Sequence, residues 1–516
     1  MDENKNLSIT QPNHSNISLL QKIGLTLVGA GFLIFILAII GVNLEVPIFL
    51  GVALLSITVG IVVYARAAYL SKPEGIKNDA NWFSSLTNRG VLGWILGIIL
   101  TGFYILLYWY PQYLGLGKEG AENTGLIAFF DPLSQFFKGE SASEWFVYGT
   151  FYTLFILALG YKFILKYRHN KYQILRTISV MFFQLGFAYL LPELLMKLKY
   201  PYYNFVNMWP LNYYFFDEWS IQGFLTNGSF GMFMLVSGIA MIFIISPILT
   251  YFYGKRWYCS WVCGCGGLAE TAGDPFRQLS SKKMSVWKFE RWSIHIVLVF
   301  SVVMTIGVIY SYLTNNAATS FLTRDQFAWG SIIFIVLVTA VVLFFKGKEL
   351  KKESKFIITS VVAVVVAIVM INLFSGNNNI VFIESYKLRE WYGFGIGSAF
   401  SGVIGVGFYP LLGNRVWCRF GCPMAAILGL QQRLFSKFRI TTNGGQCISC
   451  GNCSTYCEMG IDVRSYAQKG ENIVRASCVG CGICSAVCPR GVLNLEVKEQ
   501  NGRFGKAELL GNDSFK

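Results

Sequence analysis

The chain has 516 residues, of which 54% are hydrophobic and only 14% are charged. Charged residues make up about a quarter of a typical globular protein, so this composition excludes an ordinary soluble enzyme. The formal net charge of +15 would suit a nucleic-acid partner, but the arrangement of the basic residues indicates membrane topology instead.

Ten long apolar runs follow one another along the chain. A transmembrane helix needs about 20 largely apolar residues, and each run is close to that length. One such run could be a buried helix of a soluble core, but ten of them predict an all-α polytopic membrane bundle. The first is too long for the apolar part of a signal peptide, so we expect it to remain as a span. The runs cover approximately residues 22–42, 47–66, 90–110, 146–166, 177–197, 230–252, 294–314, 328–345, 356–374 and 394–412.

The loops between these runs alternate in charge. Residues 66–89, 166–176, 255–291 and 346–355 are rich in Lys and Arg, whereas residues 119–144 and 217–218 are acidic or mixed. Basic loops stay in the cytoplasm, so ten spans leave both termini there. We therefore expect a multi-pass protein of the inner (cytoplasmic) membrane, with its excess charge against anionic lipid and no nucleic-acid partner.

One carboxylate, Glu193, falls inside an apolar run, directly after Pro192. Ionisable residues inside spans are costly and often functional, and quinol oxidation needs a proton acceptor. Glu193 is therefore a candidate catalytic residue, although its position near the outer end suits an interfacial residue equally well. Haem is not expected, because of the three histidines (His14, His169 and His295) only His295 touches a run.

Two short cysteine motifs each follow an apolar run at its cytoplasmic end. In both, an arginine lies three residues before the first cysteine, an aromatic residue directly precedes it, and a second cysteine comes four residues after it. This indicates an internal repeat. If each motif is helical, its two thiols share one face. The pairs are Cys259 with Cys263, and Cys418 with Cys422.

Together the two pairs offer four thiols, enough for a third cluster or another thiophilic metal. Arg256, Arg415 and Arg419 would favour the thiolate form. The alternative is that these cysteines only pack at the ends of spans. Cys265 has no counterpart in the second motif, and its role is open.

Small residues follow an i+4 line along the last run. This spacing lets helices approach closely, so we expect the line to pack against a neighbouring span, with the helix bearing the first cysteine motif as a candidate. The line consists of Gly393, Gly397, Ser401 and Gly405.

Eight of the thirteen cysteines form two runs near the C-terminus: Cys447-x2-Cys450-x2-Cys453-x3-Cys457 and Cys478-x2-Cys481-x2-Cys484-x3-Cys488-Pro489. This spacing is typical of bacterial ferredoxins with two [4Fe–4S] clusters, in which the fourth cysteine of each run reaches the other cluster. The alternative, two zinc sites, rarely uses this doubled frame. We therefore assign Cys447, Cys450, Cys453 and Cys488 to cluster 1, and Cys478, Cys481, Cys484 and Cys457 to cluster 2.

One position departs from the ferredoxin pattern, because Glu458 rather than proline follows Cys457. We expect this change to alter the packing and potential of cluster 2. The sequence thus divides into a polar tail (1–21), a transmembrane domain (22–437), an α+β two-cluster ferredoxin domain in the reducing cytoplasm (438–497) and a second polar tail (498–516).

The combination of these motifs resembles the NapH/NosR/FixG group of membrane polyferredoxins. The resemblance covers about residues 230–497 and is carried by Cys418-Arg419-Phe420-Gly421-Cys422-Pro423 and the two ferredoxin runs. Members of this group include quinol-dehydrogenase subunits and factors that assist the assembly of copper-containing cytochrome oxidases. The chain departs from the group in having Gly264 in place of a proline, in its larger number of spans and in lacking a NosR-type flavin-binding outer segment.

The resemblance implies membrane electron transfer between the quinone pool or a cytoplasmic donor and a respiratory redox partner, with quinone as a candidate substrate. Two alternatives stay open. In one, the chain is an accessory factor that supplies electrons for the maturation of a metalloenzyme. In the other, it is a regulator that senses redox state through its clusters. No dinucleotide fingerprint, P-loop or nucleophilic triad is evident in the sequence.

Overall fold

The computed structural model describes residues 17–42, 45–70, 89–118, 121–316, 322–348, 350, 352–375, 379–380 and 383–497. The expected C-terminal tail (498–516), most of the N-terminal tail (1–21), His14 and most of the basic loop at 66–89 lie outside these residues.

Nine helical segments of the described chain are long and apolar enough to cross a membrane, which confirms the polytopic bundle. Seven are single helices and two contain π-helical turns. The single helices are α1 (Leu19–Ile39), α2 (Val46–Tyr69), α4 (Val91–Trp109), α7 (Glu144–Lys166), α15 (Met284–Asn315), α16 (Arg324–Lys346) and α17 (Lys352–Ser375). The others are α8 (Lys171–Phe182), η2 (Phe183–Leu190) and α9 (Leu191–Lys197), and α11 (Gly228–Ala240), η3 (Met241–Ile245) and α12 (Ser246–Tyr253).

Both interruptions have a local cause. In each case a proline, Pro192 or Pro247, lies at the second position of the helix that follows the π-helical stretch. Proline lacks the N–H that an α-helix requires, and its ring clashes with the carbonyl four residues earlier, so the preceding turn widens. The span that carries Glu193 therefore continues past Pro192 instead of breaking there.

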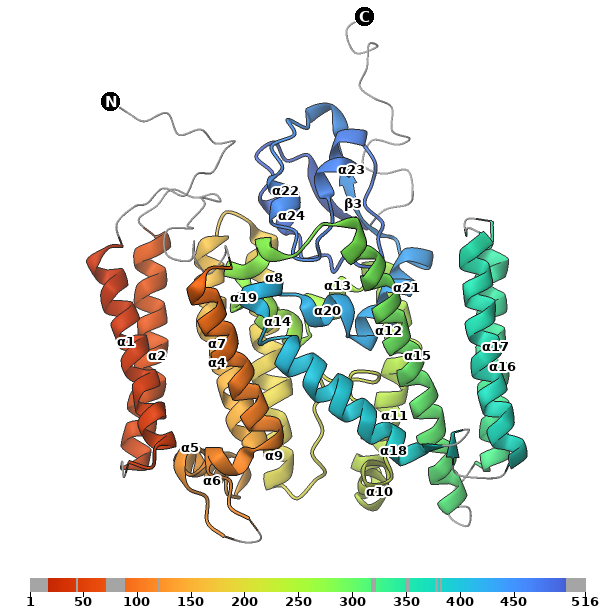
Figure 1. Ribbon diagram of the computed structural model, residues 1–516, viewed down its shortest axis with the longest axis horizontal. Helices are drawn as coiled ribbons and strands as arrows, with labels where there is room; N and C mark the ends of the chain where they lie inside the picture. Colours follow the sequence, from red (N-terminus) through yellow and green to blue (C-terminus); the bar gives the residue numbers. More distant parts are fainter. Residues whose placement is uncertain are drawn as a thin grey trace, which may run out of the picture.

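The expected tenth span, at 394–412, is helical but differs from the other nine. Helix α18 (Ser385–Tyr392) continues into the π-helix η5 (Gly393–Ile404), followed by the short helix α19 (Tyr409–Leu412). Lys387, Arg389 and Glu390 lie in its first turns and make its start too polar for an ordinary span. Figure 1 shows this segment running obliquely between the upright helices.

The small residues on this segment lie against neighbouring aromatic side chains. A Cβ atom on Gly397 would lie 2.6 Å from the Tyr213 hydroxyl, and one on Gly402 would lie 2.5 Å from the Tyr108 ring. Gly393 faces Tyr213 as Gly397 does, so the i+4 spacing holds for these two residues, and Gly402 lies beside Tyr108 of α4. The span packed against η5 is α4, which confirms the expected packing against a neighbouring span but identifies that span as another one than the candidate before the first cysteine motif.

Short elements complete the two ends of the bundle. The end remote from the ferredoxin domain holds η1 (Pro111–Leu114), α5 (Gly125–Phe129), α6 (Asp131–Lys138), α10 (Glu218–Thr226) and the two-stranded sheet of β1 (Asn379–Ile380) and β2 (Ile383–Glu384). The ferredoxin end holds α13 (Arg256–Cys259), α14 (Gly264–Thr271), η4 (Asp274–Leu279), α20 (Val416–Phe420) and α21 (Pro423–Phe435).

The C-terminal domain has the expected α+β architecture. Its antiparallel strands β3 (Phe438–Thr442) and β4 (Leu493–Val497) pair from Phe438 with Val497 to Thr442 with Leu493. Between the strands lie η6 (Gly444–Gln446), α22 (Asn452–Thr455), α23 (Val463–Lys469) and α24 (Ile483–Ala486). Figure 1 shows this domain on one end of the bundle, directly above α13, α14 and α20.

Candidate iron–sulfur sites

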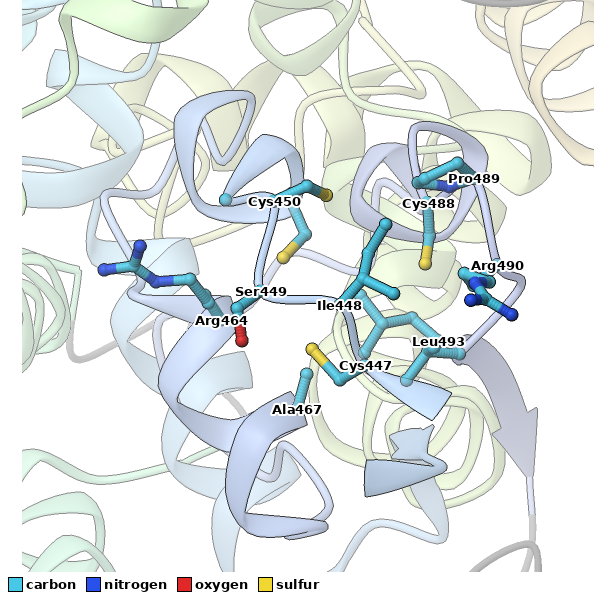
Figure 2. A pocket seen from close by; sticks show the side chains of 13 residues that line it. Cys447, Ile448, Ser449, Cys450, Arg464, Ala467, Cys488, Pro489, Arg490 and Leu493 are labelled. Atoms are coloured by element: carbon cyan, nitrogen blue, oxygen red, sulfur yellow. The ribbon is translucent and has the colours of Figure 1, made fainter. Parts of the chain in front are cut away.

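The cluster-1 thiols line a common cavity. Cys447, Cys450, Cys453 and Cys488 surround about 360 Å³ of space, part of it open to solvent. Three of them belong to the first run and Cys488 to the second, so the fold brings the runs together in the exchanged pattern that their spacing predicts. Figure 2 shows the sulfur atoms directed into this space. Cysteine-lined space of this kind fits a resident cluster.

The cluster-2 loop lies against the membrane domain. Tyr172 donates a hydrogen bond to the Gly480 carbonyl (2.9 Å), Gln173 to the Cys481 carbonyl (2.9 Å) and Ser260 to the Val479 carbonyl (2.8 Å). Gly480 has a φ of +66°, and a Cβ atom there would meet the Arg256 side chain at 2.6 Å. Only glycine permits both this conformation and this close approach.

The two Cys-x3-Cys pairs also come together, although they are far apart in the sequence. Cys259, Cys263, Cys418 and Cys422 are all buried and belong to one packed cluster of side chains. Each pair has the same backbone geometry. The N–H of Cys263 donates to the Tyr258 carbonyl (2.8 Å), and the N–H of Cys422 donates to the Trp417 carbonyl (3.0 Å). The structure thus contains the repeat that the sequence predicts.

The sequence predicts that the two cysteines of each pair lie on one helical turn, and this prediction is wrong. The first cysteine of each pair lies in a short helix, α13 or α20, whereas Cys263 and Cys422 are the N-cap residues of α14 and α21. Pro423 begins α21 and prevents α20 from continuing, while Gly264 takes the same position in the first copy. The Ala425 N–H at the start of α21 donates a hydrogen bond to the Cys422 sulfur (3.4 Å), a contact that a thiolate accepts better than a thiol.

The distance between ligand sulfur atoms differs between an iron–sulfur cluster and a single zinc ion. Sulfurs around one zinc ion lie about 4 Å apart, because zinc–sulfur bonds are about 2.3 Å long. Among the described residues, one trio of metal-ligand atoms lies within 4.8 Å of one another, and that trio is Glu270, Glu458 and Cys481. Among the described residues no three sulfurs of the three cysteine sets are this close, so none of these sets is arranged as the ligands of a single zinc ion.

That trio belongs to a buried ion-pair network instead of a metal site. Glu458 has no exposed surface and pairs with Arg277 (2.7 Å) and Arg415 (3.1 Å), while Glu270 pairs with Arg176 and Arg415. Burial alone would raise the pKa of Glu458, but the guanidinium groups of Arg415, Arg277 and Arg176 lower that pKa to about 2. The carboxylate is therefore ionised and already paired.

This network joins the ferredoxin domain to the membrane domain. Glu458 directly follows Cys457 of cluster 2, whereas Arg277 and Arg415 belong to the membrane domain. Arg415 also lies 3.5 Å from the Cys418 sulfur, to which its guanidinium group donates a weak hydrogen bond. Glu458 stands out in the sequence as a departure from Cys-Pro, but its partner Arg277 lies in no motif and could not be predicted.

The remaining candidates lie elsewhere. Glu193 is largely buried in α9, at the end of the bundle opposite the ferredoxin domain (Figure 1), so the structure does not bring it near the cysteines. His169 contacts the Ala486 carbonyl (3.2 Å) of the ferredoxin domain, and His295 bonds to the Arg291 carbonyl of its own helix. Cys265 packs against the buried cluster of the paired cysteines.

Comparisons with known families agree with this geometry. A profile described as "4Fe-4S dicluster domain" matches residues 446–493, and one described as "4Fe-4S binding domain" matches residues 236–285 and 395–441. The first match contains all eight ferredoxin cysteines, and the second contains both Cys-x3-Cys pairs. This is a multi-pass membrane protein with 4Fe–4S binding domains. Iron–sulfur clusters are therefore its expected cofactors.

A curated relative is more distant. The protein YccM of Escherichia coli (strain K12), whose name provisionally assigns it to electron transport, is 26% identical over 233 residues. The aligned region is 45% of this chain and 50% of YccM, so the chain spans about half the length of that relative. No solved structure matches the chain. The resemblance to the NapH/NosR/FixG group stays a prediction.

Proposed function

We propose that the chain relays single electrons along a line of three iron–sulfur sites, between its cytoplasmic surface and its membrane domain. The observation that carries the proposal is the order of the three cysteine sets. Cluster-1 thiols line a cavity open to solvent, cluster-2 thiols lie against the membrane domain, and the paired thiols are buried within that domain. When bound, a [4Fe–4S] cluster takes up and releases one electron at a time.

The protein's own residues give this line its rigidity and charge. Glu458 and Arg415 fix the distance between the second and third cysteine sets, because their ion pair is buried and tied to Arg277 and Glu270 on either side. Arg415 also brings positive charge to the Cys418 sulfur. Positive charge and hydrogen bonds near cysteine ligands favour thiolates and raise the reduction potential of a bound cluster.

Partners and location are proposed on the same basis. Lipid surrounds the spans, and electron transfer requires a redox partner, for which quinone or a respiratory protein is the candidate. We place the chain in the inner (cytoplasmic) membrane with both termini in the cytoplasm, since basic loops 166–176 and 255–291 lie at the ferredoxin end. The roles in metalloenzyme assembly and in redox sensing, and the proton-acceptor role of Glu193, stay predictions.

The test is a comparison of Cys259→Ser with the unmodified protein, both reconstituted anaerobically in lipid discs. Reduced methyl viologen supplies electrons, and a lipid-soluble quinone analogue accepts them. We expect both proteins to retain the ferredoxin signals in electron paramagnetic resonance. The variant should lose a third signal and at least about 10-fold of its quinone reduction rate. Quinone reduction at an unchanged rate would contradict a path through the paired cysteines.

A further inference from the structure

The rim of the cluster-1 cavity is basic. Its lining residues include two arginines, Arg464 and Arg490, and no aspartate or glutamate. Both arginine residues are exposed, and their side chains lie on opposite sides of the thiols in Figure 2. Arg464 is close to the cavity wall, because a Cβ atom on Gly451 would lie 3.8 Å from its guanidinium group. Within the described part of the chain neither arginine has an ion-pair partner, so the rim presents two positive charges around the cluster-1 thiols.

Between the two arginines the same face is apolar. Ile448, which lies next to Cys447, has 52% of its surface exposed, and Pro489, next to Cys488, is also exposed. An apolar centre surrounded by a charged rim is the arrangement found in protein–protein interfaces. The exposed Ile448 side chain can be buried only if a partner molecule covers it, which is the role of an apolar residue at the centre of an interface.

The position of this face decides what kind of partner can reach it. Arg464 lies in α23, which Figure 1 shows on the side of the ferredoxin domain away from the membrane spans, whereas Cys453 on the inner side of the cavity packs near Phe163 and Tyr167 of α7. The opposite side of the domain is covered, because the cluster-2 loop contacts Tyr172, Gln173 and Ser260. A bilayer therefore cannot approach the cavity rim, but a soluble protein can.

The geometry points to a docking surface for a small soluble one-electron carrier protein whose own redox centre is surrounded by acidic residues. Complementary charges would steer the carrier onto the Arg464–Arg490 rim, and Ile448 would be buried at the centre of the contact. In the transfer step the reduced carrier loses one electron and the cluster-1 site gains it, with no bond formed or broken and no proton moved. Of the proposed function, this inference requires only that the cluster-1 site holds an iron–sulfur cluster.

The test uses the full-length protein and two reductants, a dithionite-reduced flavodoxin as acidic carrier and a neutral small-molecule reductant. The double variant Arg464→Glu/Arg490→Glu reverses the rim charge. The matched control, Lys288→Glu/Lys352→Glu, makes the same charge change at exposed residues of α15 and α17. The measured quantity is the second-order rate of cluster reduction by flavodoxin at low salt, divided by the rate with the neutral reductant in the same variant.

We expect this ratio to fall at least about 10-fold in the rim variant and to lose most of its salt dependence, because steering by complementary charge raises association rates by 10-fold or more. In the control the ratio should change less than about 2-fold. An equal fall of the ratio in both variants would show that the overall charge of the protein, and not the rim, determines the rate. An unchanged ratio in the rim variant would show that the carrier docks elsewhere. Either result overturns the inference. Loss of reduction by the neutral reductant would instead indicate failure of the cluster-1 site itself.

Discussion

At the residue scale, Glu458 shows how one substitution in a motif changes what a domain can contact. The position that is proline after Cys488 is Glu after Cys457, and the carboxylate enters the membrane domain to meet Arg277 and Arg415. A buried ion pair is costly to break, because removal of one partner leaves a charge uncompensated in a medium of low polarity.

Replacement of Glu458 with Gln should therefore loosen the junction between the two domains. We expect a loss of about 3–5 kcal/mol in the free energy of unfolding of the ferredoxin domain, because Arg277 and Arg415 lose their shared carboxylate. The measurement is denaturant-induced loss of cluster absorbance under anaerobic conditions. Glu471→Gln, at an exposed position of the same domain, is the control and should change stability by less than about 0.5 kcal/mol. Equal denaturation midpoints for the two variants would show that the ion-pair network does not stabilise the ferredoxin domain.

The buried thiols allow a second prediction, which concerns Cys265. If Cys259, Cys263, Cys418 and Cys422 are the ligands of the third site, Cys265 is a neighbour without a ligand role. Cys265→Ser should keep the full iron content, while Cys263→Ser should lose about four irons per chain. Iron and acid-labile sulfide analysis of the two purified variants measures this directly. Loss of iron from the Cys265 variant instead would make Cys265 the ligand and Cys263 its neighbour.

At the scale of elements, the sequence predicts helices and the pairing of motifs well but predicts their geometry less well. Apolar length and thiol spacing are local signals, and they located the spans and the ferredoxin runs. The close approach of Gly402 to the Tyr108 ring is a tertiary contact with no local signature in the sequence. For the same reason the helical reading of the Cys-x3-Cys pairs was wrong, although their convergence was anticipated from the repeat.

The packing of η5 on α4 can be tested with two alanine substitutions in the same helix. A Cβ atom on Gly402 would lie 2.5 Å from the Tyr108 ring, whereas nothing lies within 4 Å of one on Gly395. We expect Gly402→Ala to cost about 1–3 kcal/mol, because α4 or η5 must shift to accept the methyl group. Gly395→Ala should be neutral or slightly stabilising. Thermal unfolding in detergent, followed by circular dichroism, compares them, and equal melting temperatures would contradict the close packing.

At the scale of the whole molecule, the described basic loops and the ferredoxin domain share one end of the bundle. The positive-inside rule then predicts a single orientation. A reporter that is active only in the cytoplasm should work when fused after Lys516, and one that is active only outside should work when inserted near Lys118. Opposite activities at either position would contradict the orientation and would separate the ferredoxin domain from a cytoplasmic electron carrier.

The central claim is that one chain holds three iron–sulfur sites in a line. It is tested most directly by the iron and acid-labile sulfide content of the full-length protein, purified without oxygen and set beside the double variant Cys259→Ser/Cys418→Ser. We predict about twelve irons and twelve sulfides per chain in the unmodified protein and about eight of each in the variant, since each [4Fe–4S] cluster contributes four. About eight irons in both proteins would contradict the claim and would leave the paired cysteines as packing residues.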